Sequence, residues 1–281
     1  MPRRSHVSRH RHEGPPLAVH SLMEARAFAE FAALPLTLPL LREAPQGDGH
    51  PVLLVPGFMA SDAALFVLKR FLQKKGYDVH TWGLGRNTGF RGKLATALPQ
   101  KIRYLHHLTG RKVSLVGWSL GGVFSLYGAQ HAPECVRNII TLGSPVTVDA
   151  HGNQSPPLVR ALYRLIANRL GASAHMMQPR AKALRERRRP DIPTTCIYTL
   201  SDGVVPPQEA TVDGDARLHE NLRVPGSHCG LVFNGVVLSV IAERLSQPED
   251  DWKPFAPTGK LDTVLDWITG PPSLVTYPAP I

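Results

Sequence analysis

The feature that most constrains this chain is a short β-prone run that leads through Gly-x-Ser-x-Gly into a helical pattern. The run is residues 112–116, and residues 123–129 continue the helical pattern. A strand that turns this sharply into a helix holds one side chain at the tip, and only small residues fit two positions before and after it. Gly117 and Gly121 occupy those positions. Ser119 is therefore predicted to lie exposed at the carboxyl end of a parallel strand and at a helix N-terminus, where negative charge is favoured.

The surrounding sequence alternates short apolar runs with amphipathic segments. Strands are expected at 52–55, 77–82, 112–118, 136–142, 194–200 and 218–224. Helices are expected from Ser61 or Asp62 to Lys75, at 93–108 with Pro99 as a kink or the true start, after Ser119, and at 231–245. This alternation predicts an α/β fold with a mostly parallel sheet and helices on both faces. The site should then lie in the loops at the carboxyl ends of the strands.

A chain of 281 residues fits one α/β domain with insertions or two small domains. Residues 1–48 read as a basic head with a helix from Ser21 to Ala33, ended by Pro35 and Pro39; the helix either packs on the main domain or lies on a lipid surface. Residues 49–248 read as the catalytic domain. Residues 249–281 read as a tail with one helix at 261–268.

An insertion at residues 145–193 interrupts the alternation and reads as a helical lid or cap. It carries an apolar helical face at 158–170 and a basic run at 180–189. An interval this long is usually functional. A mobile lid and a fixed structural cap both fit the pattern.

The formal net charge of +10 and the pI of about 9.8 allow binding to nucleic acid or to an anionic membrane surface. No nucleic-acid fold signature accompanies the charge, so no nucleic-acid partner is expected. Three sparse cysteines form no disulfide framework or zinc motif, and buried free thiols are expected for Cys135 and Cys196. No apolar run is long enough for a membrane span and no signal peptide is recognisable. A cytoplasmic protein, or one peripheral to a membrane, is expected.

A serine nucleophile needs a base, and the base needs an orienting acid. His228 is the predicted base because it follows the last strand in a tight turn, before the last helix. Asp202 is the predicted acid because it directly follows an apolar strand and precedes Gly203. The rival carboxylates Asp191, Asp213 and Asp215 lack that placement. The histidines at 106, 107, 131, 151, 175 and 219 do not occupy such loops either.

The oxyanion formed during acyl transfer needs preorganised donors. The backbone N–H of Leu120 is one candidate. The N–H of Phe58, in the loop after the first core strand, is the other, with Met59 next. Phe58, Met59 and Trp118 are the predicted substrate-binding residues. For the side chains of Phe58 and Met59, an acyl-pocket wall and ordinary core packing fit equally well.

Four motifs together resemble the lipase and carboxylesterase branch of the α/β-hydrolase superfamily. They are Val55-Pro56-Gly57-Phe58, Gly117-Trp118-Ser119-Leu120-Gly121-Gly122, Ser201-Asp202-Gly203-Val204-Val205-Pro206 and Gly226-Ser227-His228-Cys229-Gly230-Leu231. The resemblance covers roughly residues 50–245 and departs at Val-Pro-Gly, where His-Gly is common before the oxyanion residue. It implies the α/β-hydrolase fold, a Ser119–Asp202–His228 triad and a mobile lid.

The sequence therefore predicts a serine hydrolase of carboxylic esters with lipid-like or apolar acyl groups, working through an acyl-enzyme. A hydrolase of this kind needs no metal or organic cofactor, so none is expected. The partner is a small-molecule or lipid ester, with an anionic membrane surface also allowed by the charge. Two alternatives remain open: an acyltransferase that uses the same triad, and a non-catalytic lipid-binding or membrane-associated protein on the same fold. Acyl chain length, head group and oligomeric state do not follow from the sequence.

Overall fold

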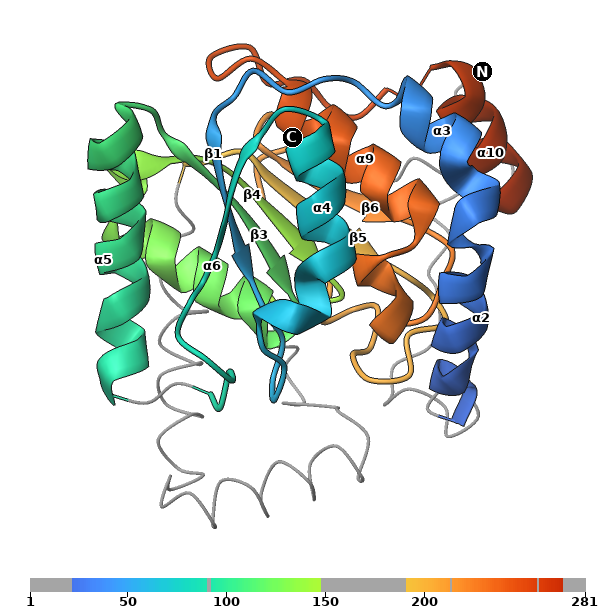
Figure 1. Ribbon diagram of the computed structural model, residues 1–281, viewed down its shortest axis with the longest axis horizontal. Helices are drawn as coiled ribbons and strands as arrows, with labels where there is room; N and C mark the ends of the chain where they lie inside the picture. The colour runs from blue at the N-terminus through green and yellow to red at the C-terminus, as the bar shows by residue number, and fades with distance from the viewer. Residues whose placement is uncertain (1–21, 90–91, 148–190, 213, 257, 270–281) are drawn as a thin grey trace, which may run out of the picture.

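The computed structural model describes residues 22–89, 92–147, 191–212, 214–256 and 258–269. Its centre is a six-stranded parallel sheet in the order β2-β1-β3-β4-β5-β6 (Figure 1). The strands are β1 (Pro51–Val55), β2 (Asp78–Thr81), β3 (Val113–Trp118), β4 (Val136–Leu142), β5 (Thr194–Tyr198) and β6 (His219–Arg223). The predicted parallel α/β sheet is confirmed. Every strand therefore delivers its carboxyl end to the same edge.

Helices cover both faces of the sheet because successive strand residues point to opposite sides. Leu53 and Val55 of β1 pack in one core with α5 (Gly92–Thr109) and α6 (Leu120–His131). Val52 and Leu54 pack in the other core with α4 (Phe66–Lys74) and α9 (Gly235–Ser246). Figure 1 shows α5 and α6 on one side of the sheet and α4 and α9 on the other.

Two helices of the structure differ in their bounds from the prediction. Helix α5 starts at Gly92 and runs through Pro99, so the proline neither starts nor ends it. The predicted helix at 231–245 is two pieces, the 3₁₀ turn η6 (Cys229–Val232) and α9. Asn234 separates them, and its Oδ1 accepts the N–H of Val236 at 2.9 Å and of Val237 at 3.4 Å. An asparagine cap of this kind starts a new helix rather than continuing the old one.

The N-terminal helical segment continues past the prolines that were expected to end it. It comprises η1 (Met23–Arg26), α2 (Ala27–Ala33), η2 (Leu34–Thr37) and α3 (Leu38–Glu43). Pro35 and Pro39 lie in the first turns of η2 and α3, where a missing N–H breaks no hydrogen bond of the helix. The prolines thus break the helix into pieces without ending the segment. Leu40 is buried in the core shared with α4 and α9.

The remaining elements of the described chain are two 3₁₀ turns and one helix, and the connection from β5 to β6, residues 199–218, carries Asp202. The 3₁₀ turns η3 (Asp62–Leu65) and η4 (Pro133–Cys135) precede α4 and β4, and α10 (Gly259–Thr269) packs on α9 through Leu261. Residues 148–190, most of the predicted lid or cap, fall outside the described part of the chain. Among the helices that the structure describes, none combines the length and the apolarity that a membrane crossing needs.

Candidate active site

Ser119 lies at the predicted strand–helix turn, in a backbone conformation that side chains rarely adopt. It connects β3 to α6 with φ 53° and ψ −123°. Such strain persists only where the surroundings enforce it. Here a Cβ added at Gly121 would collide with the carbonyl oxygen of Val55, which explains the small residue two positions after the serine. The turn predicted from Gly-x-Ser-x-Gly is confirmed, and Ser119 remains partly exposed.

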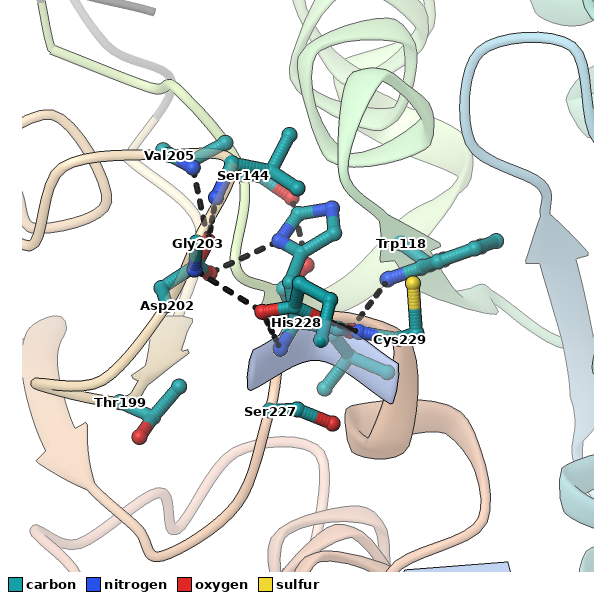
Figure 2. Close-up of polar contacts among 12 residues, drawn as sticks. Trp118, Ser144, Thr199, Asp202, Gly203, Val205, Ser227, His228 and Cys229 are labelled. Carbon is teal, nitrogen blue, oxygen red and sulfur yellow. Dashed lines mark hydrogen bonds and ion pairs between the residues drawn. The ribbon is translucent and has the colours of Figure 1, made fainter. Parts of the chain in front are cut away.

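Asp202 and His228 meet as an acid–base pair above the ends of β5 and β6 (Figure 2). The Asp202 Oδ2 and His228 Nδ1 atoms are 2.8 Å apart, and the residues are 2 % and 3 % exposed. The other carboxylate oxygen accepts the N–H groups of Val204 at 2.8 Å and Val205 at 2.7 Å. A carboxylate can only accept, so Nδ1 carries the proton and Nε2 is left to act as a base.

Two of the rival carboxylates, Asp191 and Asp215, are placed away from this pair. Asp191 is exposed at the start of the segment that leads into β5, and Asp215 binds the guanidinium of Arg217 at 2.6 Å. Asp213 lies outside the described residues.

The charges around the pair raise the pKa of the His228 imidazole. Burial of the His228 imidazole lowers its pKa, but the carboxylates of Asp202 and Glu24 outweigh burial, so the pKa lies above its usual value. The imidazolium that forms during proton transfer is thus stabilised. The neighbouring Cys229 thiol has its pKa raised to about 12 by burial and by the Glu24 carboxylate, so it stays protonated and is no rival nucleophile.

Trp118, predicted to bind substrate, also holds the histidine loop. Its indole Nε1 donates to the carbonyl oxygen of His228 at 3.1 Å, and the two rings lie 5.7 Å apart. Figure 2 shows the imidazole between the Asp202 loop and this indole. Since Trp118 precedes Ser119 directly, the contact brings the turn of the nucleophile next to the base.

The loop after β1 lies against the nucleophile, as the oxyanion prediction requires. A Cβ added at Gly57 would lie 3.1 Å from the Cβ of Ser119. The Met59 N–H donates to the carbonyl oxygen of Asn87 at 2.7 Å, so this second-choice donor is engaged elsewhere. Leu120 is the first residue of α6, and the first N–H groups of a helix have no acceptor within it. The backbone N–H groups of Phe58 and Leu120 remain the candidate donors.

Two positioning residues were missed by the sequence reasoning. Asn87 is fully buried, and its amide donates to the carbonyl oxygen of Pro56 at 2.7 Å, which fixes the loop after β1. Gly143 follows β4 with φ 52°, and a Cβ there would lie 2.9 Å from Asp202 Oδ2 and 3.0 Å from His228 Nδ1. The turn at residues 83–89 and the Gly-Ser-Pro after β4 were the available signals.

A Ser–His–Asp contact is found at the other end of the strands, away from Ser119. His50 Nε2 is 2.7 Å from Ser114 Oγ, and His50 Nδ1 is 2.5 Å from Asp48 Oδ1. Ser114 and His50 are 0 % exposed. No substrate carbonyl can reach a hydroxyl that is completely buried near the amino end of β3, so this contact is structural. In the part of the chain that is described, no three His, Cys, Asp or Glu side chains are grouped to hold a metal ion.

The sheet order, the strained serine turn and the acid and base after β5 and β6 together define the α/β-hydrolase fold. The mature form of the Bacillus licheniformis lipase BlEst2 is similar, with a TM-score of 0.54 at 21% identity over 73% of this chain and 95% of that one. MGS-MChE2, an α/β hydrolase from a lagoon-sediment metagenome, has a TM-score of 0.50 at 19% identity over 70% and 90%. Aspergillus fumigatus lipase B has a TM-score of 0.50 at 19% identity, over 77% of this chain and 56% of that one. The sequence matches no protein-family model and no curated protein.

Proposed function

We propose that this chain is a serine hydrolase that cleaves carboxylic esters through an acyl-enzyme intermediate. The observation that carries the proposal is the buried contact between Asp202 and His228, assembled beside the strained turn that holds Ser119. The names of the similar lipases support ester substrates. A module that only binds lipid has no use for a nucleophile, a base and an orienting acid together.

In the first half of the proposed reaction, Ser119 Oγ attacks the ester carbonyl carbon while His228 Nε2 takes the hydroxyl proton. The carbonyl oxygen becomes an oxyanion that the N–H groups of Phe58 and Leu120 stabilise. The intermediate collapses as the carbon–oxygen bond to the alcohol breaks, and the imidazolium gives its proton to the leaving oxygen. Asp202 keeps the imidazole in the required tautomer throughout.

In the second half, water attacks the acyl carbon. His228 accepts one proton from that water and returns it to Ser119 Oγ as the acid leaves. Transfer of the acyl group to an alcohol would follow the same steps with the alcohol in place of water, so the products distinguish hydrolysis from acyl transfer.

We further propose that the substrates are apolar or lipid-like esters and that the protein works at an anionic lipid surface. Glu24, Arg26 and Glu30 of the N-terminal helical segment contact the loops after β5 and β6, while part of the apolar surface of the segment faces outward. Six large apolar residues of this segment are exposed: Leu22, Met23, Phe28, Phe31, Leu36 and Leu38. Exposed apolar area beside a site, on a chain of net charge +10, favours an anionic interface.

The test combines a fluorophosphonate probe with a panel of p-nitrophenyl esters of increasing acyl length. The probe should label Ser119 alone, and Ser119→Ala should lose labelling and at least about three orders of magnitude in kcat/KM. Ser125→Ala, at a buried serine in the middle of α6, is the control, and it should keep both the labelling and the kcat/KM of the wild type. Ester hydrolysis that survives Ser119→Ala would rule out the proposed nucleophile.

A further inference from the structure

The N-terminal helical segment reaches the catalytic loops through three charged side chains. Arg26 Nη2 donates to Ser201 Oγ at 2.6 Å and to the carbonyl oxygen of Gly226 at 2.7 Å. Glu30 Oε1 accepts the N–H of Ser227 at 2.9 Å. The segment therefore contacts the loop that carries the acid as well as the loop that carries the base.

Glu24 makes the most direct of these contacts. Its Oε1 accepts the N–H of Gly203 at 2.9 Å and the N–H of His228 at 3.0 Å. Its Oε2 accepts the N–H of Cys229 at 3.0 Å. One carboxylate thus joins the residue after Asp202 to the backbone of the base itself.

We propose that Glu24 is a positioning residue for the acid–base pair, an inference that rests on the proposed hydrolase function. Its carboxylate fixes the loops after β5 and β6 relative to each other, so that Asp202 and His228 stay in contact and Nε2 keeps its place beside the nucleophile. Charge-assisted bonds from one carboxylate to three backbone N–H groups are strong and directional. A small displacement of a catalytic group is expensive, because about 1 Å of misplacement lowers a rate by roughly 100-fold.

Glu24 also acts on the base through its charge. The charged groups that raise the pKa of His228 are Asp202 and Glu24, against the effect of burial. Arg26 and Glu30 contact the same loop through its neighbouring residues and pair with each other at 3.2 Å. Removing the Glu24 charge while keeping its shape should therefore lower the pKa of the imidazole.

The test compares Glu24→Gln with Glu43→Gln. Glu43 lies on α3 of the same segment, is half-exposed, and pairs with Lys260 away from the catalytic loops, so it is the matched control. We expect Glu24→Gln to lower kcat per active site by about 10- to 100-fold with little change in KM. The acidic limb of its kcat/KM profile should also shift to lower pH, because an imidazole with a lower pKa stays unprotonated there. Active sites are counted with the fluorophosphonate probe, and folding is checked by thermal melting.

A purely structural Glu24 gives a different result. The variant would then melt earlier and contain fewer active sites, while kcat per active site and the acidic limb of the pH profile stay as in the wild type. That outcome overturns the proposal.

An NMR titration of the His228 imidazole, assigned with His228→Gln, reads the charge effect without any substrate. A lower pKa in Glu24→Gln supports the proposal, and an unchanged one contradicts it. If wild type and Ser119→Ala hydrolyse esters equally, the proposed function fails, whereas the titration still reports on Glu24.

Discussion

The contact of Ser114 with His50 and Asp48 shows that residue type and distance alone do not make a nucleophile. Ser114 lies near the amino end of β3 and is completely buried, whereas Ser119 lies at a strained turn after the carboxyl end of β3 and is partly exposed. Only the second hydroxyl can meet a substrate carbonyl, and only it lies beside candidate oxyanion donors. The environment of the side chain, set by its place on the strand, decides between structure and chemistry.

At this scale the sequence singled out Ser119, Asp202 and His228 as candidates because each follows a recognisable strand, and their catalytic roles stay predictions. It could not identify Glu24, Asn87 or Gly143. Glu24 and Asn87 act through hydrogen bonds to residues far away in the sequence, and Gly143 acts by the absence of a side chain. Local patterns mark the turns that hold Asn87 and Gly143, but they do not show the partners of these residues.

Gly143→Ala should disrupt the acid–base pair. The added Cβ would lie within 3.0 Å of Leu231, Asp202 and His228, at a residue whose φ is 52°. The displaced imidazole should lower kcat/KM by roughly 100-fold or more. Gly110→Ala is the matched control, since its φ is also positive, at 67°, but a Cβ there meets nothing within 4 Å. Ester kinetics and melting of both variants separate loss of position from backbone strain. Equal losses in the two variants would attribute the effect to strain alone.

At the scale of elements, the sequence predicted a helix in the N-terminal segment. It did not show which face of that helix would contact the rest of the protein. Periodicity shows that a face exists, whereas the partner of each face depends on the tertiary structure. Here Glu24 and Glu30 accept backbone N–H groups of the loops after β5 and β6, whereas Leu40 of the same segment packs in the core. The prolines were misread for a related reason, because a proline at a first turn and a proline after a last turn look alike in sequence.

The double variant Phe28→Ser/Leu36→Ser should weaken binding to anionic lipid vesicles. The two residues are 83% and 82% exposed, and a lipid surface that buries them gains the free energy of removing apolar area from water. We expect a loss of roughly 10- to 100-fold in partition coefficient onto phosphatidylserine-containing vesicles, measured by flotation. Leu108→Ser, at a 60% exposed leucine on α5, is the control. Equal binding by all three proteins would contradict a lipid contact through this segment.

At the scale of the molecule, a polar network around the buried His50 ties the amino ends of β1 and β3 together and sets how the fold responds to acid. Asp48 Oδ2 accepts from Arg111 Nη2 at 2.7 Å and from Arg137 Nη1 at 2.8 Å, while Oδ1 contacts His50. Burial lowers the pKa of His50 from 6.5 to about 4, against the raising effect of Asp48. Although partial burial raises the pKa of Asp48, hydrogen bonds from Arg137 and His50 hold it well below its usual value.

Acid should therefore destabilise the protein in two stages. The folded state keeps His50 neutral, and this contributes on the order of 3 kcal/mol to the free energy of unfolding. The contribution is complete above pH 6.5 and is lost as the pH falls towards about 4. The Asp48 contribution is lost below the pKa of about 4 that the carboxyl group has in the unfolded chain. Urea unfolding at pH 7, 5.5 and 4 measures the fall. His50→Gln should flatten it, and His80→Gln, at a partly exposed histidine beside Asp78, should not. An unchanged slope in His50→Gln would refute this assignment.

The long reach of Glu24 also has a consequence for the timing of assembly. Its first partner, Gly203, follows it by 179 residues and its last, Cys229, by 205. At about 5–20 residues per second, a ribosome needs roughly 10 to 40 s to add that length of chain. In the later part of that interval, once Ser119 has been added, a nascent chain holds the serine turn but still lacks the carboxylate contact between the loops of the acid and the base. Synthesis itself thus delays the completed triad until nearly all of the sheet has been made.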